Sequence, residues 1–192
     1  MPARRYRRAP PAWRGIVLVA AAALALTADP HAWASTGTRP TGTELKAYIA
    51  AVEPIRDGVN RLLDTADPPL KAWRMHRITG AQAGAAIGAL EQRFAVFTVE
   101  INDLHPSDQT LDRINGPYAR TYLLEDAYLR SLAAALPSGS FSSLPKTAEQ
   151  QRRTIVSWRK RVEALALQLR VRLPRDLGHA GRGDIAPSPF GS

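Results

Sequence analysis

The residue of this chain best suited to chemistry is a glutamate set inside an otherwise apolar helical stripe. At 100° per residue, Glu125 falls in the middle of a run of apolar and aromatic residues, which are Leu111, Tyr118, Tyr122, Leu129 and Leu132. A carboxylate at that position must be at least partly buried. Because a buried charge is costly, the group has to be paired, hydrogen-bonded or protonated.

Two interpretations of Glu125 follow. In the first, which we favour, the carboxylate is structural: it pairs with an arginine at the edge of another stripe, Arg56 or Arg93, or accepts hydrogen bonds from Tyr118 or Tyr122. In the second, it is a polar group in the wall of a ligand pocket between helices. A cavity beside Glu125 favours the second interpretation.

Other chemistry finds little support in the residue pattern. A di-metal centre in a four-helix bundle needs Glu-x-x-His on two helices, and the chain has no copy of that motif. The chain also has no cysteine, which excludes a covalent haem attached through Cys-x-x-Cys-His. No Gly-x-Ser-x-Gly elbow is present. We therefore predict no catalytic residue, no metal site and no cofactor.

The elements that position Glu125 are predicted to be helices. Three threonines each stand three residues before a Glu or Gln and just ahead of an apolar helical pattern, which is the capping-box signature of a helix start. These pairs are Thr41 with Glu44, Thr79 with Gln82, and Thr147 with Gln150. A further start is expected at Ser107 or Asp108, and a short helix at Asp67-Pro68-Pro69.

The periodicity predicts four long amphipathic helices, which end near residues 64, 103, 136 and 173, with a bend or break at Gly116-Pro117. The fold class is therefore all-α: an antiparallel up-down four-helix bundle over residues 41–173, with a short extra helix after the first long one. Residues 174–192 are rich in glycine, proline and serine, and we expect an irregular C-terminal tail there.

The N-terminal residues resemble an export signal. Five arginines within the first fourteen residues precede an uncharged run, Gly15 to Ala28, which is short for a membrane span. Small side chains at Ala32 and Ala34 place the expected cleavage between Ala34 and Ser35. Residues 1–34 are thus predicted to be a signal peptide and 35–40 a flexible lead. The alternative is an uncleaved anchor, the only form in which the chain would hold to a membrane.

Charge is concentrated in the last predicted helix. The whole chain has a net charge of +9, and removal of the signal lowers it to about +5. Residues 146–175 carry nine basic and two acidic residues, whereas the rest of the mature chain is slightly acidic. The proposed basic face consists of Arg152, Arg153, Arg159, Lys160, Arg161, Arg170 and Arg172. Such a face could bind an anionic envelope polymer or an acidic protein. The alternative is an ordinary solvated surface without a partner. Nucleic acid is not expected as a partner.

Three segments resemble a group of small exported helical proteins of unknown function from high-GC actinobacteria. They are Tyr118 to Leu136 (YARTYLLEDAYLRSLAAAL), Ile155 to Arg159 (IVSWR) and Gly181 to Pro189 (GRGDIAPSP). The resemblance implies a helical fold and an extracytoplasmic compartment, and it implies no activity. Some members of the group look like lipoproteins, and this chain departs from them because it has no cysteine to modify.

These observations favour an exported, non-enzymatic helical bundle that acts as a binding or interaction module in or beyond the cell envelope. The first alternative is a small-ligand binder or enzyme with a pocket around Glu125, Tyr118 and Tyr122. The second is a sensor-like extracytoplasmic bundle, which requires that the signal segment stay attached. The oligomeric state has no signature in the sequence.

Overall fold

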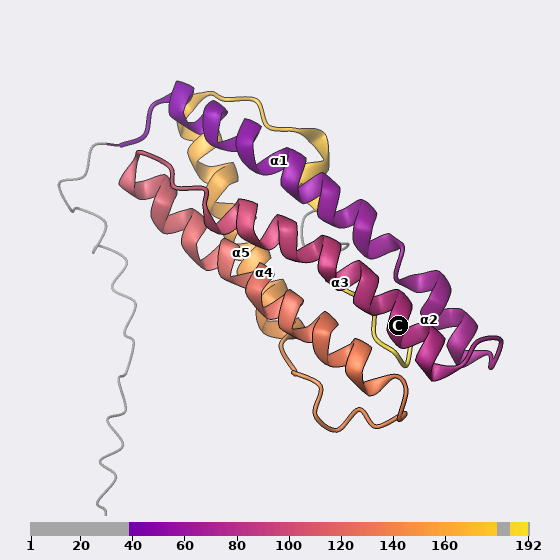
Figure 1. Cartoon of the computed structure of the whole chain (residues 1–192). Coiled ribbons are helices and arrows are strands. Elements are labelled where there is room, and N and C mark those ends of the chain that lie inside the picture. Colours follow the sequence, from indigo (N-terminus) through magenta and orange to yellow (C-terminus); the bar gives the residue numbers. More distant parts are fainter. Residues whose placement is uncertain (1–38, 180–184, 192) are drawn as a thin grey trace, which may run out of the picture. The chain divides into compact units, whose positions relative to one another are not determined.

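The computed structural model describes residues 39–179 and 185–191, and these residues form helices and no strand. The long helices are α1 (Gly42–Asp64), α3 (Gly80–Asn102), α4 (Gln109–Ala135) and α5 (Ala148–Leu169), and the short helix α2 (Asp67–Arg74) follows α1. Figure 1 shows each long helix running opposite to the next, so the predicted four-helix bundle is confirmed. The signal peptide and the Ala34–Ser35 cleavage site lie outside the described residues.

Each long helix packs against the next one in the chain, and the last packs against the first. α3 packs against α1 and most extensively against α4, α4 packs against α5, and α5 returns to α1. Gly80 and Gly84 allow the closest approach, because a Cβ at these two positions would lie 2.2 Å from the carbonyl oxygen of Leu136 and 2.8 Å from that of Ala133. The small residues on α3 therefore let the end of α4 pack against the first turns of α3.

The capping predicted at the starts of α1, α3 and α4 is present, whereas the starts of α2 and α5 have no side-chain cap. Thr41 and Thr79 both form complete capping boxes, and Asp108 accepts from two free amides of the first turn of α4. The capping box predicted at Thr147 does not form. The backbone of Thr147 has φ −100° and ψ −12°, which is helical rather than extended, and its side chain caps no amide. Of the bend or break expected at Gly116-Pro117, the break is absent, since α4 continues through both residues.

The core combines apolar side chains with a short buried polar chain. Trp158 of α5 donates from Nε1 to the hydroxyl of Tyr48 at 2.7 Å, and that hydroxyl donates to Oδ1 of Asn115 at 3.1 Å. The three residues belong to α5, α1 and α4, so one hydrogen-bonded chain joins three helices. Among the described residues, no helix has the length and apolar character needed to cross a bilayer.

The segment after α5 packs against the bundle although most of it lacks regular structure. Arg175–His179 form a 3-10 helix, η1, which the sequence pattern did not predict. Leu177 and Ala186 are buried in the same core as the long helices. The residues predicted to be an irregular tail thus contribute to the core at two places, one on each side of residues 180–184.

Candidate functional site

Glu125 is buried in α4, as predicted, with 2% of its surface exposed. Its Oε2 accepts from Nε2 of Gln151 on α5, and its Oε1 accepts from the backbone amide of Ala186 in the C-terminal segment, both at 2.8 Å. Among the described residues no cation pairs with this carboxylate. One side chain therefore joins α4, α5 and the C-terminal segment through two neutral donors.

Gln151 is itself held in a fixed orientation. It is 2% exposed, and its Nε2 also donates to the carbonyl oxygen of Thr121 at 3.2 Å. Its Oε1 accepts from the hydroxyl of Thr147 at 3.4 Å. Because both ends of the amide are engaged, the amide nitrogen is directed at Glu125.

The titration of Glu125 follows from its burial. Loss of hydration raises the pKa of Glu125 from its ordinary 4.5 to about 7, and the hydrogen bonds from Ala186 and Gln151 oppose this rise because they favour the charged form. The phenol of Tyr128, one turn further along α4, has its pKa raised to about 12 by burial and by the charge of Glu125. The site thus contains a carboxyl group that changes charge near neutral pH.

A cavity of about 280 Å³ lies beside this carboxylate. Its polar wall contains Glu125 and Gln151, and Lys146 stands exposed at its edge. The remaining lining comes from α4, from the connection between α4 and α5, from Ala148 at the start of α5, and from residues of the C-terminal segment between Ile185 and Phe190. A cavity beside Glu125 was the feature expected to favour the pocket interpretation, and the structure has one.

Aromatic rings form much of the apolar wall. Tyr128, Phe141 and Phe190 all line the cavity. Phe141 meets Trp73 and Phe190 edge to face, with centroid distances of 5.5 and 5.2 Å. The hydroxyl of Tyr128 donates to the carbonyl oxygen of Pro187 at 3.4 Å. Ring contacts and this hydrogen bond attach the C-terminal segment to the two sides of the cavity.

The two tyrosines predicted to accompany Glu125 lie elsewhere in the core. The ring of Tyr118 stacks on Trp158 at 4.2 Å, and that of Tyr122 stacks on Phe94 at 5.8 Å. Their hydroxyls lie 3.1 Å apart, and neither residue lines the cavity. The expected hydrogen bonds from Tyr118 and Tyr122 to Glu125 are therefore wrong, since both rings pack into the aromatic centre of the bundle.

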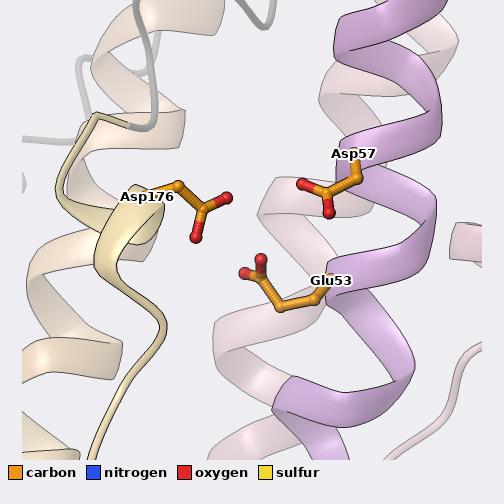
Figure 2. A group of neighbouring side chains, drawn as sticks. All are labelled: Glu53, Asp57 and Asp176. Atoms are coloured by element: carbon orange, nitrogen blue, oxygen red, sulfur yellow. The ribbon is translucent and has the colours of Figure 1, made fainter.

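Arg56 is also buried, but it does not pair with Glu125. Its guanidinium lies 3.2 Å from a carboxylate oxygen of Glu53, 3.9 Å from one of Asp57, and against Asp176 of η1. Figure 2 shows the three carboxylates turned toward a common space from α1 and η1. Because Arg56 already supplies the positive charge in that space, this acidic group is explained as an ion-pair cluster that fastens η1 to α1.

Arg93, the other arginine proposed for Glu125, is exposed on α3. It lines a shallow surface hollow together with Gly58, Arg61 and Phe97, and it has no contact with the Glu125 cavity. Its position on the helix places it on the α1 side of α3, whereas Glu125 faces α5. The proposed pairing is therefore wrong for both arginines.

The proposed basic face is largely exposed and is partly neutralised by acids on the same helix. Arg152, Lys160, Arg161, Arg170 and Arg172 are exposed, as is Arg153, while Arg159 is half-buried. Glu149 pairs with Arg152 and Arg153, and Glu163 lies 3.6 Å from Arg159. These pairs between neighbouring turns reduce the positive potential that the residue count suggests.

Sequence reasoning missed two components of the site. Gln151 stands on the stripe that continues through Ile155, Trp158 and Val162, so the same periodicity that identified Glu125 could have found a second buried polar residue facing it. The Ala186 amide is a backbone donor, and its residue type carries no sign of its role.

Comparison with known proteins gives no functional lead: the chain matches no protein-family model, no curated protein and no solved structure. The interpretation of the site rests on its geometry alone.

The raised pKa of Glu125 predicts how stability depends on pH. Between about pH 4.5 and about pH 7 the folded chain holds a proton on Glu125 that the unfolded chain has released, so the free energy of unfolding decreases as pH rises through this range. The slope from this group approaches about 1.4 kcal/mol per pH unit. Urea unfolding of the wild-type chain and of Glu125→Gln at several pH values measures it.

The difference in unfolding free energy between the two chains isolates Glu125, because other carboxyl groups with a raised pKa, such as Glu53 and Asp126, are present in both. We expect the unfolding free energy of the wild-type chain, relative to that of Glu125→Gln, to decrease from pH 4.5 to pH 7 and then to level off. A difference that stays constant over this range contradicts the assignment.

Proposed function

We propose that this chain is an exported, non-enzymatic binding protein that holds a small molecule in the cavity beside Glu125. The observation that supports this most directly is a buried carboxylate in the wall of a cavity that the C-terminal segment helps to line. A charged group inside a bundle is costly, and an apolar residue of similar size would satisfy packing alone. Its presence next to open space favours a role in recognition.

The size and composition of the cavity agree with a small ligand. Its volume, about 280 Å³, lies close to the lower limit of about 300 Å³ for ligand sites. Aromatic and aliphatic residues supply most of the wall, and only a few polar groups interrupt it, which is the usual composition of such sites. The site therefore suits a compact, largely apolar molecule with one polar end.

Pocket binding is tested by filling the cavity. Ala148 lines it from the first turn of α5, so Ala148→Trp should occupy its space and lower ligand retention by about ten-fold or more. Ala50, exposed on α1 and absent from the cavity lining, provides the matched control Ala50→Trp. The measurement is native mass spectrometry of each folded protein after exposure to a small-molecule extract of the producing cells.

The expected result is a molecule retained by the wild-type chain and by Ala50→Trp, and lost from Ala148→Trp. Equal retention by all three proteins would place the binding elsewhere. Retention by none of them would contradict a ligand-binding function.

The proposed compartment rests on the N-terminal sequence, with its arginines, its uncharged run and Ala34 before Ser35. We expect the protein recovered from culture medium to begin at Ser35, and N-terminal sequencing checks this. A full-length chain in the membrane fraction would instead support the anchored, sensor-like alternative. A full-length chain in the cytoplasm would contradict export.

A further inference from the structure

We propose that the ligand of the Glu125 cavity is a small organic amine in its protonated form, with its ammonium group on the Glu125 carboxylate and its apolar body among the rings of Tyr128, Phe141 and Phe190. This inference rests on the proposed binding function and adds the chemical class of the ligand.

The carboxylate retains capacity for further donors. A carboxylate offers about four lone-pair sites. Gln151 and the amide of Ala186 each occupy one, on different oxygens. An ammonium group has hydrogen-bond donors and no acceptor, so it can use the remaining sites without competing with either neighbour.

The charges around the cavity also favour a cation at Glu125. Among the described residues, Glu125 is the only acidic one that lines it, and its two hydrogen-bond partners are neutral. Tyr128 is the other titratable group on α4 that lines the cavity, Lys146 is exposed at the edge, and residues 185–191 of the C-terminal segment have no charged side chain. A bound ammonium would compensate the desolvated carboxylate, whereas an anionic ligand would be repelled by it.

The aromatic wall suits an organic cation in particular. The faces of phenylalanine and tyrosine rings attract a cation within about 6 Å. Contacts with Trp73 and Pro187 hold Phe141 and Tyr128 in position. A divalent metal ion fits poorly, because Ca²⁺ needs about six to eight oxygen ligands and the described part of this wall offers a single carboxylate.

Three molecules of nearly equal size test the inference: 2-phenylethylamine, 2-phenylethanol and phenylacetate. Calorimetric titration of the full mature protein at pH 8 is expected to show the amine binding about ten-fold or more tightly than the alcohol, and phenylacetate the most weakly. In Glu125→Gln the affinity for the amine should fall to the affinity for the alcohol. Lys146→Met, which removes the positive charge at the edge, should keep or strengthen amine binding.

A second measurement covers the case in which Glu125→Gln does not fold. In the wild-type protein, the affinity for the amine should fall by about ten-fold from pH 8 to pH 6, because Glu125 becomes protonated while Tyr128 stays neutral. The affinity for the alcohol should stay constant. Equal pH dependence of the two ligands overturns the inference.

The failures can be told apart. If the alcohol or phenylacetate binds as tightly as the amine, or if Glu125→Gln keeps the preference, the cavity is a ligand site and the amine inference is wrong. If the amine fails to bind while native mass spectrometry still shows a retained molecule, the inference is likewise overturned and the binding function stands. If no molecule is retained and none of the three binds, both proposals fail.

Discussion

The interaction on which this site depends is the pair of hydrogen bonds that Gln151 and the amide of Ala186 donate to the buried carboxylate of Glu125. The first bond joins α4 to α5 inside the bundle. The second fastens a segment without regular structure to α4. Because residues of that segment also line the cavity, the same carboxylate that would bind a ligand holds part of the cavity wall in position.

Charged and aromatic groups hold the C-terminal segment at several points. Arg56 of α1 binds Asp176 in η1 at one end, and Phe141 meets Phe190 near the other. Arg74 of α2 also reaches the carbonyl oxygens of Ser188 and Pro189, at 3.4 Å each. A chain without cysteine has no disulfide to fix such a segment, so buried polar contacts and ring packing hold the segment in place.

The fold was accessible from the sequence because helical periodicity and capping boxes are local signals. Thr41 and Thr79 predicted their helix starts correctly. At Thr147 the local signal failed, since the side chain of Thr147 is engaged with Gln151, which tertiary contacts draw toward Glu125.

The site was accessible only in part. The stripe of α4 predicted that Glu125 is buried, and Arg56 is buried as well, but one partner of each, Ala186 and Asp176, follows from the path of the C-terminal segment. That path has no periodicity, and one of its decisive groups is the backbone amide of Ala186. Residue types identified the polar groups of the interior, while tertiary packing decided which of them meet.

The central claim is that the amide of Ala186 is bound to the carboxylate of Glu125, and nuclear magnetic resonance of that single amide tests it most directly. The account predicts that the Ala186 amide proton exchanges slowly with solvent and that its chemical shift titrates with a midpoint near pH 7, in step with Glu125. Exchange at the rate of an unstructured chain, with a shift unchanged from pH 5 to pH 9, would contradict it.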